Sequence, residues 1–151
     1  MEDVEKLTIK DAENAGKGLL ALALAYPGYP KGFKADNTTV KWNSMNAERS
    51  IGIFPLQGAV YVKKYVSGSY IAQMPIQIQY KSSPTTNKES ISAQQVVNDL
   101  AAWMEESGIE FKDPHLTLET IERTSQVFGG GQDEKTVVYA VNMQLRYFYK
   151  K

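Results

Sequence analysis

The stretch from residue 135 to residue 151, KTVVYAVNMQLRYFYKK, decides the fold. Its odd positions from 137 to 149 are all apolar or aromatic, and polar side chains stand at several of its even positions: Asn142, Gln144, Arg146 and Lys150. Because side chains on a strand alternate between faces, this pattern predicts one long β-strand with an apolar face and a mixed face. At about 3.3 Å per residue the strand spans roughly 40 Å and crosses the whole domain. It contains no nucleophile, acidic pair or metal ligand, so we interpret it as scaffold.

Two helices are predicted to pack on the sheet that contains this strand. Residues 2–25 are rich in strong helix formers, with acidic residues in the first turn, and the helix ends before Pro27. The second helix is predicted to start at Ser90 or Ser92 and to end at Gly108, a suitable left-handed cap. Its apolar residues recur at helical spacing: Ala93, Val96, Val97, Leu100, Ala101 and Met104.

The remaining strands are predicted from alternation and from turn residues. Four strands precede the second helix, at 38–43, 49–54, 59–66 and 70–81, and one follows it at 116–124. Pro75 implies a bulge or an edge in its strand, and the glycine-rich segment 126–134 is predicted to be an exposed loop. We therefore expect an α+β fold with a mainly antiparallel sheet and two helices packed on it, in the order α-β-β-β-β-α-β-β. Residues 1–151 form a single domain, without a visible internal repeat.

The composition argues against several classes of function. Basic and acidic residues number 17 each, which disfavours a general nucleic-acid or membrane-surface binder. The chain has no cysteine, which excludes disulfides, thiolate catalysis and zinc-thiolate sites. The start is acidic and the most apolar stretch, 18–26, is about half of the length that a membrane span needs. We expect a soluble, unexported protein.

No residue pattern predicts a catalytic, metal or cofactor site. His115 is the only histidine, no cluster of acids has metal-ligand spacing, and the glycines at 129–131 lack the Gly-Lys-Ser/Thr context of a phosphate loop. We therefore expect a protein that is not an enzyme. One alternative is a small enzyme or ligand-binding domain with a pocket between the second helix and the sheet. Another is a single-strand nucleic-acid binder, because aromatic and basic residues interleave at 61–65 and 146–150.

Rows of amides along the long strands have two possible roles. Gln73, Gln77 and Gln79 alternate with apolar residues in the strand at 70–81, as Asn142 and Gln144 do in the last strand. They line either a solvated face or a seam between subunits. Tyrosine and arginine are effective anchors of protein interfaces, being large and amphipathic.

Several soft motifs in this order resemble the tail terminator family of tailed bacteriophages and prophages, often labelled minor capsid protein. The resemblance covers roughly residues 45–150. It is carried by these segments: Arg49 to Phe54, Ser67 to Tyr70, Pro75 to Lys81, Thr86-Asn87, the helix from Ala93 to Trp103, the turn from Gly129 to Asp133, and Val137 to Tyr139.

The resemblance implies a structural virion protein of the tail or neck that assembles in the host cytoplasm. Its subunits are expected to form a homo-oligomeric ring, a hexamer, on the head-proximal end of the tail tube. The implied partners are further copies of the chain, the tail tube protein and the head-tail connector protein. Such a ring stops tube polymerisation and provides the head-joining surface; no membrane or sequence-specific nucleic-acid partner is implied.

We hypothesise that two loops dock axially on the tube or connector, and that the long strands and the first helix build the seams between subunits. A closed ring needs two different complementary patches on each subunit. The proposed interface residues are Pro55, Leu56, Gln57 and Gly58 in one loop, Gln126, Val127, Phe128, Gly129, Gly130, Gly131 and Gln132 in the other, and Arg146, Tyr147 and Tyr149 on the last strand.

Overall fold

The computed structural model describes residues 4–30, 33–36, 38–45, 49–57, 60–83, 87–109, 111, 113–132 and 136–151. These residues form two helices and a seven-stranded sheet, which confirms the α+β class and the mainly antiparallel pairing. In chain order the elements are α1 (Val4–Ala25), β1 (Val40–Trp42), β2 (Ser50–Pro55), β3 (Tyr61–Lys64), β4 (Tyr70–Ser82), α2 (Asn87–Ser107), β5 (Leu116–Arg123), β6 (Phe128–Gln132) and β7 (Val137–Tyr149).

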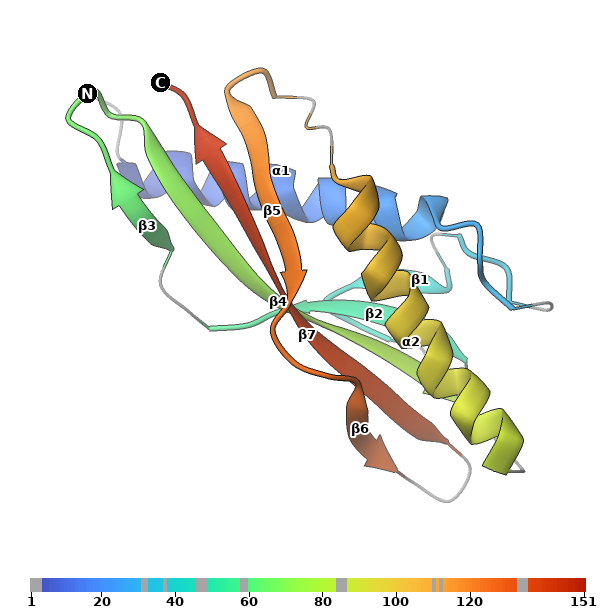
Figure 1. Ribbon diagram of the computed structural model, residues 1–151. Coiled ribbons are helices and arrows are strands. Elements are labelled where there is room, and N and C mark those ends of the chain that lie inside the picture. The colour runs from blue at the N-terminus through green and yellow to red at the C-terminus, as the bar shows by residue number, and fades with distance from the viewer. Residues whose placement is uncertain are drawn as a thin grey trace.

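Two long strands form the centre of the sheet. β4 and β7 each have 13 residues and pair antiparallel over their whole length. On the outer side of β4, the first residues of β4 pair with β3 and its last residues pair with β2. On the outer side of β7, the first residues of β7 pair with β6 and its last residues pair with β5. β1 extends the sheet as a parallel neighbour of β2. Figure 1 shows β3 and β6 at opposite ends of the crossing pair.

Both helices cover the same face of the sheet. One core joins α1, the predicted apolar stripe of α2 and one side of the long strands. Its buried strand residues are Tyr70, Ala72, Met74, Ile76, Ile78 and Tyr80 of β4 and Val141, Met143, Leu145 and Tyr147 of β7. The alternation seen in the sequence therefore defines the core. Among the described residues no helix packs on the opposite face, which carries the amide rows.

The sheet contains an internal repeat, so the expectation of none is wrong. β4 begins at residue 70 and β7 at residue 137, a shift of 67 residues. The same shift relates β3, which begins at residue 61, to β6, which begins at residue 128. It also relates residues 50–55 of β2 to residues 117–122 of β5. Each unit of three strands follows a helix. We call residues 50–82 the first unit and residues 116–149 the second unit.

The strand register shows that an approximate two-fold axis relates the two units. Ile76 pairs directly with Met143, and these residues are equivalent under the shift, so the axis passes between them. The pair Ile51 and Tyr80 in the first unit corresponds to Leu118 and Tyr147 in the second, which also pair. Both short strands, β3 and β6, contain a bulge where they meet the long strand.

Two local differences from the predicted elements concern β6 and the start of α2, whereas the predicted cap at Gly108 is confirmed. Residues 128–132 form β6, where a flexible loop was predicted, because an edge of β7 is available to pair with a glycine-rich segment of low strand propensity. α2 begins at Asn87, so Ser92 lies inside the helix and forms no N-terminal capping box. Gly108 follows α2 with φ of +69°, as predicted for a left-handed cap.

Pro75 is tolerated because β4 changes neighbours at that position. β2 pairs with β4 up to Ile76, and β3 pairs from Ala72 towards Tyr70, so β4 has an open edge between them. The Pro75 carbonyl accepts a hydrogen bond from Leu56 N at 2.9 Å on this side. The missing N–H of Pro75 points the same way, and no strand partner is lost. The predicted local edge is confirmed.

Candidate assembly interface

The first candidate surface surrounds β3 and is called the β3 edge. It comprises four exposed apolar side chains: Val60, Val62, Tyr65 and Val66, of which Val66 is fully exposed in the turn after the strand. β3 pairs only with β4, so in the described part of the chain no strand lies on its outer side. A strand with an open edge and exposed valines is an unusual surface for a monomer, because it is a template for pairing with another chain.

Two lysines flank the apolar side chains of the β3 edge. The Lys64 ammonium lies 4.1 Å from the ring centroid of Tyr61, and the Lys63 ammonium lies 5.0 Å from that of Tyr65. These are cation–π distances. Tyr61 in turn packs edge-on against Tyr70 with centroids 5.0 Å apart. The β3 edge therefore combines apolar side chains, aromatic rings and positive charge.

The second candidate surface surrounds β6 and is called the β6 edge. It comprises Val127, Phe128 and Gly129, at the end of the sheet opposite to the β3 edge (Figure 1). Phe128 is 38% exposed, and a Cβ added at Gly129 would have no atom within 4 Å. β6 pairs only with β7 among the described strands. Val127 and Phe128 are the repeat equivalents of Val60 and Tyr61, so the two edges occupy equivalent places in the two units.

The amide rows form hydrogen bonds with one another across the helix-free face. Gln77 Nε2 donates to Asn142 Oδ1 at 3.0 Å, and Gln144 Nε2 donates to Gln73 Oε1 at 2.6 Å. Gln79 donates to Gln77. These side chains are half-buried, so they form a pre-ordered polar surface rather than a core.

Arg146 is the exception on this face. Its Nε is buried and has no hydrogen-bond partner among the described residues. Arg146 pairs across the sheet with Gln73 of β4 and Thr120 of β5, neither of which is acidic. Its repeat equivalent is Gln79, which does donate a hydrogen bond. Within the described residues, the Arg146 Nε therefore has no hydrogen-bond partner at a position where the first unit has a hydrogen-bonded amide.

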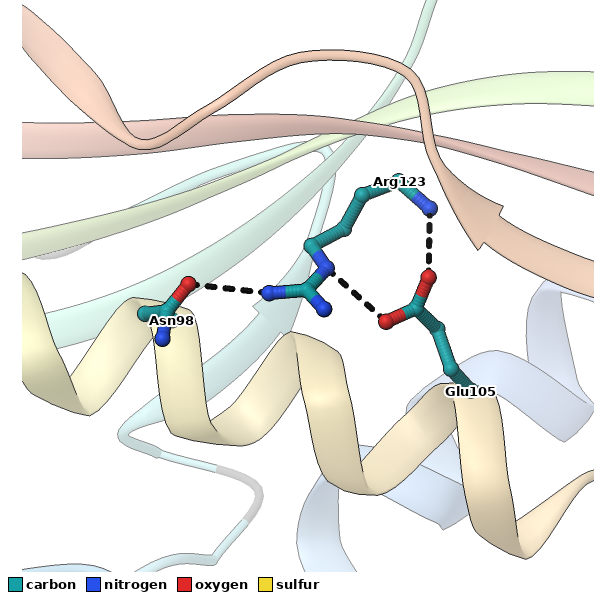
Figure 2. A network of polar contacts seen from close by, with 3 residues as sticks. All are labelled: Asn98, Glu105 and Arg123. Atoms are coloured by element: carbon teal, nitrogen blue, oxygen red, sulfur yellow. Dashed lines mark hydrogen bonds and ion pairs between the residues drawn. The ribbon is translucent and has the colours of Figure 1, made fainter.

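A polar network ties α2 to the end of β5 beside the β6 edge (Figure 2). The Arg123 Nε forms an ion pair with Glu105 Oε1 at 2.8 Å, and Arg123 Nη1 donates to Asn98 Oδ1 at 2.9 Å. The backbone N of Arg123 donates to the other carboxylate oxygen of Glu105 at 3.0 Å. The network fixes the position at which the chain leaves β5 and turns towards β6.

Two hollows flank α2. One, of about 320 Å³, is lined by Arg49, Tyr80, Glu89 and Ser92 among others, and Arg49 Nε donates to the Tyr80 hydroxyl at 2.6 Å. The other, of about 560 Å³, lies between α2 and the β5–β6 connection and is lined by Ile91, Gln94, Gln95, Asn98, Arg123, Ser125, Gln126 and Val127. Within the described residues, no group of three or more acidic or histidine side chains could hold a metal ion.

His115 lies in the loop before β5, where the sequence places it. Its Nδ1 is 2.7 Å from the Lys150 carbonyl oxygen, and its ring lies 5.8 Å from that of Tyr149. The side chain is exposed. His115 therefore joins the end of β7 to the start of β5.

The structure places the predicted interface residues at several different locations. Pro55 ends β2, whereas Leu56 and Gln57 are exposed in the β2–β3 connection; Gly58 lies outside the described residues. Gln126 is exposed, and residues 128–132 form a strand rather than a docking loop. The seam predicted for the first helix stays a prediction.

Tyr147 does not belong to an interface, which corrects the prediction. Its side chain is only 1% exposed and packs against Phe111 with ring centroids 6.1 Å apart. Tyr147 shares the apolar face of β7 with Leu145, and that face is covered by the helices. Tyr149 is half-buried and stacks on Tyr70 with centroids 4.9 Å apart.

Sequence analysis missed the valines and the tyrosine of the β3 edge as interface candidates. The signal is visible in the stretch AVYVKKYV at 59–66, where apolar residues occur at both even and odd positions: Val60 and Val62 at even ones, and Tyr61 and Tyr65 at odd ones. A strand with two apolar faces needs cover on both sides. The Tyr61 side chain of β3 packs against the core, whereas Val60 and Val62 stay exposed.

Comparisons with known proteins bear on the fold alone. No protein-family model matches the chain, and no curated protein matches it. One similar solved structure is 16% identical, with a TM-score of 0.51 over 94% of this chain and 96% of that chain, and its name states no function. None of the helices in the described residues is long and apolar enough to cross a membrane. The likeness supports the α+β architecture over nearly the full length of both chains.

Proposed function

We propose that this protein is a structural subunit of a bacteriophage tail, which forms a homo-oligomeric ring at the head-proximal end of the tail tube. The ring stops polymerisation of the tube protein and provides the surface that joins the head connector. It forms through contacts between copies of the chain, and a hexamer is expected. The phage context and the two further partners come from the resemblance to tail terminators described above.

One observation supports the assembly part of the proposal: the sheet has two separate open strand edges with exposed apolar side chains. The β3 edge and the β6 edge lie at opposite ends, and both expose apolar side chains beside an open strand edge. A subunit with two different patches joins its neighbours head to tail, and such contacts close into a ring when the rotation between copies allows it.

Axial docking on the tube is assigned to the β2–β3 connection. Leu56 is 39% exposed there, beside the exposed Gln57. The connection follows a strand end held in the sheet, because Leu56 N donates to the Pro75 carbonyl. A fixed base with an exposed apolar side chain suits a contact with a rigid tube end.

The test is to mix the purified protein with tail tube protein from the same genome. Native mass spectrometry should give a ring mass, and electron microscopy should show the protein at tube ends and shorter tubes than in its absence. A Leu56→Asp variant should remove tube-end binding but keep the ring. Ile91→Asp is the matched control, because Ile91 is exposed on α2, outside the β2–β3 connection, and its variant should cap tubes normally.

The opposite result is equally clear. A protein that stays monomeric and leaves tube length unchanged, at concentrations at which the tube protein polymerises, removes the terminator proposal. Circular dichroism of each variant establishes that loss of capping is not loss of folding.

A ligand-binding domain is the second candidate, favoured by the hollow of about 560 Å³ beside α2. Volumes of this size are within the range of small-molecule sites. Its polar lining offers amides and one paired arginine, Arg123, and no titratable pair for acid–base chemistry among the described residues. A ligand screen that follows thermal stability tests this candidate, because a bound ligand raises the melting temperature.

A further inference from the structure

We infer that neighbouring copies join edge to edge, with the outer side of β3 in one copy pairing antiparallel with the outer side of β6 in the next. This inference rests on the proposed ring and names the seam that builds it. The occupant of each open edge is therefore a second copy of this chain.

The internal two-fold axis supplies the first reason. It makes β3 and β6 equivalent strands at opposite ends of one sheet, each with its outer side open in the described part of the chain. When β3 of one copy lies beside β6 of the next copy in a continuous sheet, a second approximate two-fold axis passes between these two strands. Strands related by such an axis run antiparallel, the arrangement that permits a continuous ladder. Each copy then extends the sheet of its neighbour.

Side chains at the two edges supply the second reason. Val60 and Val62 on the β3 edge are 41% and 43% exposed, and Phe128 on the β6 edge is 38% exposed. Directly opposed β-branched and aromatic residues are favourable cross-strand pairs. The open space at Gly129 leaves room for the side chains of an approaching strand.

Charge decides between unlike and like edges. The first unit carries three lysines, Lys63, Lys64 and Lys81, and no acidic residue, a formal charge of +3. The second unit carries four acidic residues, Glu119, Glu122, Asp133 and Glu134, against three basic ones, Arg123, Lys135 and Arg146, a formal charge of −1. Lys63 and Lys64 stand on β3 itself, so two β3 edges would bring four lysines together. Asp133 and Glu134 directly follow β6 in the sequence. Opposite charges favour pairing of the β3 edge with the β6 edge, and like charges disfavour pairing of two β3 edges.

Cysteine crosslinking tests the seam, because the chain has no cysteine of its own. The two variants are Val62→Cys and Gly129→Cys, at positions that are equivalent under the repeat and that tolerate a thiol, since Val62 is exposed and Gly129 faces open space. The variants are treated with a short bismaleimide separately and as a mixture, with and without tail tube protein. Glu106→Cys, on the exposed side of α2, is the control for random encounters.

The mixture should give covalent dimers several-fold more efficiently than either variant alone, and more than Glu106→Cys mixed with Gly129→Cys. A chain with both Val62→Cys and Gly129→Cys should give a ladder of products that ends at the ring size. Dimers of Val62→Cys alone at the same yield would overturn the inference, because like edges would then meet.

Mass spectrometry separates failure of the seam from failure of the ring. If a ring mass appears and the mixture gives no crosslink, the seam lies elsewhere and the inference is wrong, while the proposed function stands. If neither a ring mass nor a crosslink appears with tube protein present, both are wrong.

Discussion

Replacement of Arg146 by glutamine is expected to stabilise the folded subunit. Glutamine is the residue that the repeat places at the equivalent position, Gln79, where it makes a hydrogen bond on the same sheet face. Arg146 Nε is buried without a partner among the described residues, and an unsatisfied buried donor costs about 1–3 kcal/mol. The substitution removes this cost, but it also removes one buried methylene group, whose burial stabilises the fold by about 0.8 kcal/mol. The net expectation for Arg146→Gln is between no change and a gain of about 2 kcal/mol.

Urea unfolding followed by circular dichroism measures the effect. With a slope of about 2 kcal/mol per molar urea for a small domain, a gain of 1 kcal/mol raises the midpoint by about 0.5 M. Measurements at several protein concentrations are needed, because assembly adds its own stability to that of the subunit. The slope should not change if the substitution acts on the folded state alone.

Arg123→Gln is the matched control and should have the opposite sign. The Arg123 Nε is paired with Glu105 at 2.8 Å, with the two side chains 34% and 25% exposed, and Nη1 donates to Asn98. Loss of a partly exposed ion pair and one hydrogen bond should destabilise the fold by about 1 kcal/mol. If Arg146→Gln destabilises the fold as much as Arg123→Gln does, the Arg146 side chain is satisfied in solution and the reasoning about its burial is refuted.

Two further predictions concern single positions in the fold. Gly52→Ala should lower the free energy of unfolding in urea by about 1–3 kcal/mol, because the new Cβ would lie 2.7 Å from the Ser44 carbonyl oxygen and 2.6 Å from Met45 Cγ. An unchanged urea midpoint would show that the segment with Ser44 and Met45 moves aside freely. Burial raises the pKa of the Tyr29 hydroxyl, which donates to the Ala23 carbonyl, so the folded chain keeps a proton that the unfolded chain loses above about pH 10. The stability that the protonated Tyr29 hydroxyl contributes is complete below about pH 10 and is lost as pH rises further. The melting temperature should therefore fall less between pH 8 and pH 11 for Tyr29→Phe than for the native chain. Equal falls for the two proteins would contradict the raised pKa of Tyr29.

Long periodic segments were predictable from the sequence, and short edge strands were not. The alternation in β4 and β7 and the apolar stripe of α2 each involve many residues that share one face, so they predict type and orientation together. β6 escaped prediction because three glycines in FGGGQ have low strand propensity. Its strand exists because an edge of β7 is available, which is a tertiary effect.

The repeat left a short trace in the sequence. Ile76-Gln77-Ile78-Gln79-Tyr80 aligns with Met143-Gln144-Leu145-Arg146-Tyr147 after a shift of 67, and Val60-Tyr61 aligns with Val127-Phe128. Most other strand positions differ, so the trace is too brief to identify without the register of the strands. The same alignment would have placed Tyr147 in the core, since it follows the apolar alternation that buries Tyr80.

Divergence between the two units gives the proposed ring its direction. Two identical units would present identical edges, and the β3 edge could then pair with the β3 edge of another copy, so that neighbouring copies would point in opposite directions. The first unit instead has lysines on its edge strand, while the second has glycines on the strand and acidic residues after it. Pairing of unlike edges leaves one open edge at each end of every partial assembly, so growth continues until the ring closes. On this argument, the charge difference between the units, and not their shared fold, gives every copy the same direction along the ring.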